Sequence, residues 1–152
     1  MARMQQGYYF EEINVGLEIV SPGRTVTESD VVMFAGLSGD YESLHTDAEY
    51  AKSTPYGERI AHGLLGLSIA SGLAARTGAL EGTVLAFTGL SWKFKAPVKI
   101  GDTIRLRARV TKARPLPRMG GGLVVLAVQV LNQRDEVVQN GEWTLLMKSR
   151  PA

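Results

Sequence analysis

A chain of 152 residues, of which 45% are hydrophobic and 21% charged, is long enough to bury a core without crosslinks and lacks the composition of a disordered protein. It contains no cysteine and two histidines, which excludes disulfides and thiolate metal sites and makes a zinc site unexpected. The net charge of +2 is far below the basic excess of a nucleic-acid-binding protein, so we expect no nucleic-acid partner.

The first part of the chain carries weak signals. Met1 to Gly7 is expected to be a loose start, and the residues up to Phe10 include no apolar run typical of a signal peptide, so we expect a cytoplasmic protein. Glu18 to Thr27 has strand character at both ends and a bend at Ser21-Pro22-Gly23. No internal repeat or linker is apparent, which predicts a single domain over residues 1–152.

A first helix is predicted over Glu28–Ser38. Thr27 is a suitable N-cap, and Asp30 stands at the position where a capping box places its acidic partner. Gly39 follows the last apolar residues and is expected to end the helix, because glycine readily adopts the left-handed conformation found at helix ends.

A second, shorter helix is predicted over Asp47–Ser53. Thr46 is the expected N-cap, Glu49 lies three residues further on, and Pro55 prevents the helix from continuing. Asp40 to His45 is therefore predicted to be a loop between two helices, a place where functional residues are common.

The third and longest helix is predicted over Ile60–Arg76, with Gly78 after its end. Its apolar stretch is shorter than the roughly 20 residues that a membrane span needs, so we expect a buried helix and no membrane association. Glycine costs about 1 kcal/mol relative to alanine inside a helix. We therefore expect a sheet to approach this helix closely at its three glycines, Gly63, Gly66 and Gly72.

From Thr83 onward the pattern changes to strands. Apolar residues alternate with polar ones, most clearly from Thr103 to Val110, as in a sheet with one buried face. Pro115–Gly122 reads as a long loop. Helices followed by consecutive strands predict an α+β fold with an antiparallel sheet. The strands are predicted over Val84–Pro97, Thr103–Arg114, Leu123–Gln133 and Val137–Lys148.

Four motifs, taken together, resemble the MaoC-type dehydratases, the (R)-specific enoyl-CoA hydratases. They are G-R-T-V-T-E-S-D from Gly23, G-D-Y-E-S-L-H-T-D from Gly39, A-H-G-L-L from Ala61 and W-K-F-K-A-P-V-K-I-G-D from Trp92. The resemblance implies a hot-dog fold, in which a curved antiparallel sheet wraps a long central helix. It also implies a homodimer or a dimer of dimers.

The same resemblance implies reversible syn hydration of a trans-2-enoyl thioester of CoA or acyl-carrier protein to the (R)-3-hydroxyacyl thioester, without a cofactor. By position, Asp40 and His45 become the catalytic pair, and the amide of Gly63 becomes the donor to the thioester oxygen. Ser71 falls where the family places a hydroxyl that supports the histidine. The chemistry is consistent, because hydration needs a base, a proton donor and charge stabilisation at that oxygen.

The motif around the catalytic pair departs from the family pattern D-x-N-P-x-H, since Glu42-Ser43 stands where Asn-Pro is usual. Glu42 thus places a second carboxylate near Asp40 and is a candidate substrate-binding residue. Lys93 and Lys95 are candidates to contact the phosphates of the thioester carrier, although a solvated strand face would also explain them.

Plainer explanations exist for single residues. An aspartate after a helix-ending glycine is often a turn residue, and His62 is expected to shape the start of its helix rather than act as a base. Two other functions stay open: a hot-dog thioesterase, and a non-catalytic subunit that binds acyl thioesters. The pair Asp40 and His45 favours the hydratase.

Overall fold

The computed structural model describes residues 7–151, so the predicted loose start falls, apart from Gly7, outside the described residues. Within them, six strands form an antiparallel sheet. The strands lie in the order β1 (Glu18–Val20), β4 (Thr103–Leu116), β5 (Gly121–Leu131), β6 (Val137–Lys148) and β3 (Val84–Phe94), and β2 (Arg24–Thr25) also pairs with β4.

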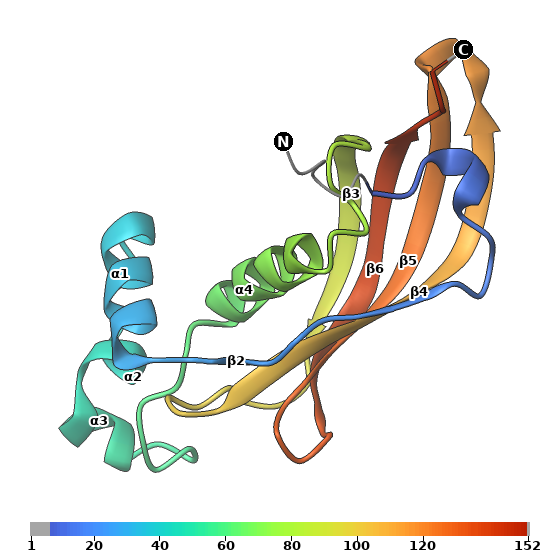
Figure 1. Ribbon diagram of the computed structural model, residues 1–152. Coiled ribbons are helices and arrows are strands. Elements are labelled where there is room, and N and C mark those ends of the chain that lie inside the picture. The colour runs from blue at the N-terminus through green and yellow to red at the C-terminus, as the bar shows by residue number, and fades with distance from the viewer. Residues whose placement is uncertain (1–6, 152) are drawn as a thin grey trace, which may run out of the picture.

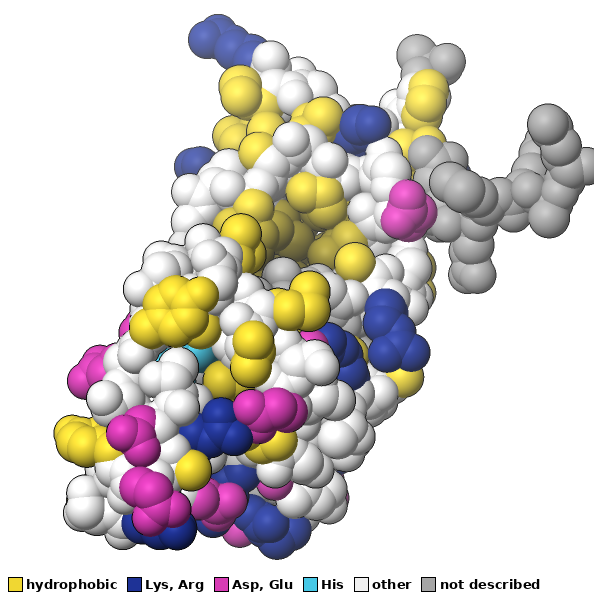
Figure 2. Space-filling model, turned by 90° about the vertical axis from the view of Figure 1, so that its left-hand side faces the viewer, with side chains coloured by type: hydrophobic (Ala, Val, Ile, Leu, Met, Phe, Trp, Pro, Cys, Tyr) yellow, Lys and Arg dark blue, Asp and Glu magenta, His cyan; other side chains and the backbone are white. Residues whose placement is uncertain are grey.

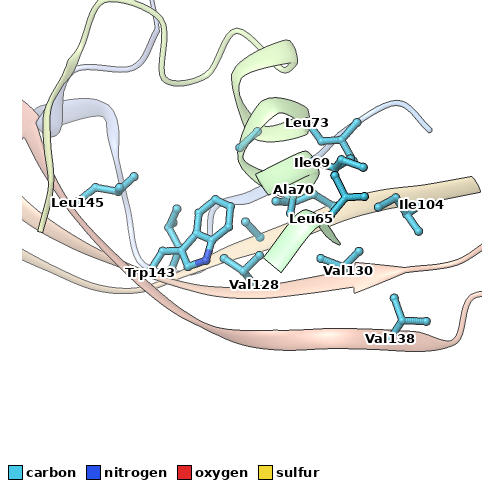
Figure 3. Close-up of a cluster of buried hydrophobic side chains, with 14 of the residues drawn as sticks. Leu65, Ile69, Ala70, Leu73, Ile104, Val128, Val130, Val138, Trp143 and Leu145 are labelled. Atoms are coloured by element: carbon cyan, nitrogen blue, oxygen red, sulfur yellow. The ribbon is translucent and has the colours of Figure 1, made fainter. Parts of the chain in front are cut away.

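Helix α4 (Gly63–Arg76) lies across the curved face of the sheet, and the long strands bend around it (Figure 1). The alternation in β4 is as predicted, because its buried residues face this helix. Figure 3 shows the contact between the two layers: Leu65, Ile69, Ala70 and Leu73 from α4, and Ile104, Val128, Val130 and Trp143 from the sheet. Each large side chain buried here contributes roughly 1.5–3 kcal/mol. The α+β class and the hot-dog arrangement are confirmed.

Helix α1 (Glu28–Ser38) has the predicted bounds and the predicted cap. The Thr27 hydroxyl accepts a hydrogen bond from the Asp30 amide (3.2 Å), and the Asp30 carboxylate accepts one from the Thr27 amide (2.8 Å). Gly39 ends the helix with φ of 77°. Local sequence is sufficient here because every group of the cap lies within one turn.

The predicted start of the second helix is wrong. The segment forms two short helices, α2 (Ser43–Thr46) and α3 (Ala48–Lys52), and Asp47 rather than Thr46 caps the second one by accepting from the Tyr50 amide. The Thr46 hydroxyl instead donates to the carbonyls of Tyr41 and Glu42. The supposed loop is therefore partly helical, and His45 lies on α2.

Helix α4 starts at Gly63, three residues later than predicted, because Ile60 forms an isolated β-bridge with Lys99. Close approach explains Gly63 and Gly66, where an added Cβ would contact Phe94 and Gln139 respectively. It does not explain Gly72, which has open space around its Cβ position among the described residues. No helix in residues 7–151 is both long and apolar enough to cross a membrane.

The connection between β4 and β5 is shorter than predicted. Both strands extend into the supposed loop, leaving only a single 3₁₀ turn (Pro117–Met119) and Gly120 between them. Gly120 has φ of 70°, which favours glycine, so the turn closes a tight hairpin. β3 and β5, in contrast, end earlier than predicted, before Pro97 and Gln133 respectively. β6 has the predicted bounds.

Candidate active site

The end of α1, the short helix α2 and the first turn of α4 meet around a cavity of about 510 Å³. Asp40, His45, His62 and Gly63 line its polar side. Figure 2 shows the face of the molecule on which a small area of histidine is visible beside a cluster of hydrophobic side chains. The structure thus brings together the three residues predicted for catalysis, Asp40, His45 and Gly63, and adds a second histidine.

The orientation of His45 is fixed by the backbone. Its Nδ1 lies 2.8 Å from the carbonyl oxygen of Ile60, and its side chain is 9% exposed. A carbonyl oxygen only accepts hydrogen bonds, so Nδ1 must carry the proton of the neutral ring. Nε2 then holds the free lone pair, and His45 is prepared to act as a base through that atom.

Asp40 follows the glycine that ends α1 and has an exposed carboxylate. Its Oδ1 accepts a hydrogen bond from the Glu42 amide at 3.2 Å, and its own amide donates to the Ser38 hydroxyl at 3.1 Å. These bonds fold the chain after α1 into a compact turn. The carboxylate keeps acceptor capacity for a water molecule beside His45.

His62 is the residue that the sequence interpretation undervalued. It is 2% exposed, its Nε2 lies 2.9 Å from the carbonyl oxygen of Asp40, and its ring stacks on His45 with the centroids 3.9 Å apart. The ring of Phe34 contacts it from α1, at 4.9 Å between centroids. His62 is predicted inside the first turn of the helix, but it is the N-cap residue of α4, and its side chain makes no cap hydrogen bond. A histidine directly before a glycine-led helix was the available signal.

Asp40, His45 and His62 form the candidate metal-ligating group within residues 7–151, with one ligand atom of each within 4.8 Å of the others. The two imidazole planes are only 29° from parallel and stack face to face. Lone pairs of ring nitrogens lie in the ring planes, so these rings do not aim them at a common point as metal ligands do. The geometry fits proton transfer better than metal binding.

Gly63 and Leu64, in the first turn of α4, line the cavity. The first amides of a helix have no acceptor within the helix, and here His62 does not cap them. They are donors for a developing negative charge, aided by the helix dipole. Gln139 supports this turn from β6: its Nε2 donates to the Gly63 carbonyl and its Oε1 accepts from the Trp92 indole, both at 3.0 Å. Sequence reasoning did not identify Gln139.

An ion pair ties α1 to the segment before α4. Arg59 donates to both carboxylate oxygens of Glu28, at 2.6 and 2.9 Å. This hydrogen bonding holds the pKa of the Glu28 carboxyl below its usual value. The pair is partly exposed, so its main effect is to fix the relative position of the two segments that carry Asp40 and His62.

Comparison with known proteins identifies the family. The family described as MaoC like domain matches residues 14–130. The chain belongs to the MaoC-like family. An (R)-specific enoyl-CoA hydratase of Rhodospirillum rubrum is 35% identical to this MaoC-like protein, with 94% of each chain covered.

Two solved structures share the fold of this MaoC-like protein over most of their length. The monoamine oxidase regulatory protein from Archaeoglobus fulgidus has a TM-score of 0.89 at 38% identity, covering 97% of this chain and 99% of the other. An (R)-hydratase from Pseudomonas aeruginosa has a TM-score of 0.80 at 32% identity, covering 95% and 88%. The resemblance inferred from the four motifs is confirmed.

The two lysines predicted to bind the substrate lie at different places in the MaoC-like protein. Lys95 lines the cavity together with Asp40 and His45. Lys93 does not: it borders a different hollow of about 600 Å³, with Arg107 and Arg109, on the sheet face that points away from α4. That hollow is larger but contains no histidine, so it lacks the acid–base pair.

Two further expectations for the site are not met in this chain. Ser71 is exposed and donates its hydroxyl to the Ser68 carbonyl at 2.7 Å, so the predicted support of His45 is wrong within one subunit. Distance along the helix explains the error, because Ser71 is exposed and lies about 12 Å beyond Gly63 along α4 at 1.5 Å per residue. Glu42 contributes its backbone to α2, and its side chain is not among the described groups lining the cavity.

Proposed function

We propose that this MaoC-like protein catalyses the reversible addition of water to a trans-2-enoyl thioester, giving the (R)-3-hydroxyacyl thioester. The observation that carries the proposal is the fixed tautomer of His45, whose Nε2 is left as a base in the same cavity as Asp40 and the first amides of α4. The relatives named as (R)-specific hydratases support the direction and stereochemistry of the reaction.

Each chemical requirement has a group in the cavity. Nε2 of His45 takes a proton from water while the water oxygen bonds to C3 of the substrate, and the carboxylate of Asp40 orients that water. The electron pair of the C2–C3 double bond moves toward the thioester oxygen, where the amide of Gly63 stabilises the enolate charge. A proton then returns to C2 on the same face. Dehydration follows the same steps in reverse.

The substrate is proposed to enter with its carrier outside and its acyl group inside. Tyr56, Leu64, Phe94 and Val98 supply apolar surface to the cavity, which suits an acyl chain. Lys95 is the cation placed to meet a phosphate of CoA or of acyl-carrier protein. Lys93 borders the hollow on the other sheet face, and we do not propose it for this role.

The protein is further proposed to act as one hot-dog domain in a homodimer. β3 is an edge strand, paired only with β6 among the described strands, and Leu85, Phe87, Leu90 and Phe94 on it are each about half exposed. A long apolar edge is an open pairing surface unless another chain covers it. Because Phe94 also lines the cavity, a partner at β3 would border the site.

The proposal is tested by adding crotonyl-CoA and following the loss of enoyl-thioester absorbance. Wild-type protein should consume it, and Asp40→Asn should lower turnover by about 10²-fold, because a positioned acid–base group is lost. Glu49→Gln is the matched control, since Glu49 is an exposed residue paired with Lys52 on α3, and it should keep wild-type activity. Release of free CoA thiol would instead indicate a thioesterase, and binding without turnover would indicate a non-catalytic subunit.

A further inference from the structure

We propose that His62 is a positioning residue for the catalytic pair: it holds the backbone of Asp40 and supports the ring of His45. The inference rests on the proposed hydratase function, in which Asp40 and His45 act on water. His62 borders the cavity, but its ring is almost wholly buried against His45 and Phe34, so we assign it no proton transfer to the substrate.

The first element of this role is a hydrogen bond to Asp40. The carbonyl of Asp40 can only accept, so Nε2 of His62 carries the proton and donates it across 2.9 Å. The bond joins residues 22 positions apart and fixes the loop after α1 to the start of α4. Without it, Asp40 would be held only by two local hydrogen bonds, from the Glu42 amide to its carboxylate and from its own amide to the Ser38 hydroxyl.

The second element is the stack with His45. The Ile60 carbonyl fixes one nitrogen of His45 but leaves the ring free to tilt about that bond. A second ring 3.9 Å away, itself in contact with Phe34, restricts this tilt. Nε2 of His45 is thereby kept aimed into the cavity. Misplacement of a catalytic group by about 1 Å can cost roughly 10²-fold in rate.

The structure separates this role from two plainer ones. A helix cap would require a hydrogen bond from the side chain to the first amides of α4, and His62 makes none. A purely apolar core residue would have no polar contact, whereas Nε2 of His62 donates a hydrogen bond to the Asp40 carbonyl. Nδ1 of His62 is buried without a partner in the described residues. A leucine or phenylalanine would avoid burying an unpaired nitrogen, which is destabilising.

Two substitutions divide the role into its parts. His62→Phe keeps a stacking ring and removes the donor, and His62→Gln keeps a donor of similar reach and removes the ring. For crotonyl-CoA hydration we expect His62→Phe to lower kcat roughly 10- to 100-fold with little change in KM, and His62→Gln to lose less. In the Asp40→Asn variant, adding His62→Phe should lower kcat further by less than about threefold. The two effects are not additive, because His62 acts through the Asp40 carboxylate that this variant already lacks.

Hydrogen–deuterium exchange over residues 39–47 gives a readout that does not depend on activity. His62→Phe should raise exchange in this segment at least about tenfold and leave β5 unchanged, and His62→Gln should raise it less. Equal losses of kcat in both backgrounds, or unchanged exchange in the segment, would overturn the proposal. So would a uniform rise of exchange throughout the protein, which would mark a core residue. An inactive wild type would refute the hydratase function, while exchange would still decide whether His62 holds the loop.

Discussion

The backbone at Gly63 lies under the ring of Phe94, and this contact explains why the residue is glycine. A Cβ built at Gly63 would lie 2.8 Å from a carbon of the Phe94 ring. Gly63 also lines the cavity, where we propose that its amide binds the thioester oxygen. Gly63 therefore serves packing, and its proposed role as a donor to the substrate can be tested separately from packing.

Gly63→Ala should lower both thermal stability and kcat. The added methyl displaces the Phe94 ring, and overpacking of this kind costs about 1–3 kcal/mol. In the double variant Gly63→Ala, Phe94→Leu the melting temperature should recover, because the smaller side chain leaves room. Recovery of kcat together with stability would show that packing alone was disturbed; a persistent loss of kcat is expected, because the methyl obstructs the amide.

Residues of the site could be predicted from sequence where their role depends on neighbours along the chain. Asp40 and His45 share one motif, and Gly63 follows directly from the A-H-G motif and the helix after it. Gln139 could not be found, because it reaches Gly63 from 76 positions away. Ser71 was placed wrongly because motif position alone does not tell which side of α4 faces the cavity.

At the scale of elements, α1 links the stability of a helix to the geometry of the site. Its last residue precedes Gly39 and Asp40, and its Phe34 contacts His62. The cap at its start uses Asp30, which also forms an ion pair with Arg24 at 2.6 Å. Partial burial alone would raise the pKa of the Asp30 carboxyl, but hydrogen bonds from Thr27 and Arg24 outweigh it and hold that pKa below 3.8.

Asp30→Asn should therefore lower the free energy of unfolding near neutral pH by about 1 kcal/mol, the usual value of a lost cap. Because the Asp30 carboxyl has a lower pKa in the folded than in the unfolded chain, its ionised form stabilises the fold at pH values above the unfolded pKa. This contribution is lost as the pH falls through the folded pKa. The difference between wild type and variant should be constant near neutral pH and shrink below about pH 3.8. Urea unfolding at several pH values measures this difference in the free energy of unfolding. The control Glu49→Gln removes an exposed charge, and its free energy of unfolding should match that of the wild type.

Bounds of elements were predictable where a local signal is unambiguous, as for α1 and β6. They failed where a distant partner decides. The β4–β5 hairpin extends through Pro115 and Leu116 because β5 offers paired backbone opposite them. Ile60 is drawn out of the helix by its bridge to Lys99, a contact that helical periodicity alone cannot reveal.

For the whole molecule, the sheet has two unlike edges. β1 covers one with three residues, whereas β3 leaves eleven residues with an open side in the described structure. Apolar side chains about half exposed along β3 match the proposed homodimer, and a partner there would also border the cavity through Phe94.

Leu90→Lys should convert the dimer into a monomer, because a charge on an open strand edge opposes strand pairing. Light scattering after size exclusion should give a mass near 16.5 kDa instead of twice that value. Leu37→Lys, at an apolar side chain that is 85% exposed on α1, is the control and should leave the dimer intact. A wild type that is already monomeric would contradict the β3 interface.

The stacking of His45 on His62 has a practical consequence, because these are the only two histidines in the sequence. A histidine-selective isotope label therefore yields imidazole resonances that all come from the cavity. Nuclear magnetic resonance could follow both ring tautomers during titration with a substrate analogue, in the unmodified protein and without assignment of the remaining spectrum.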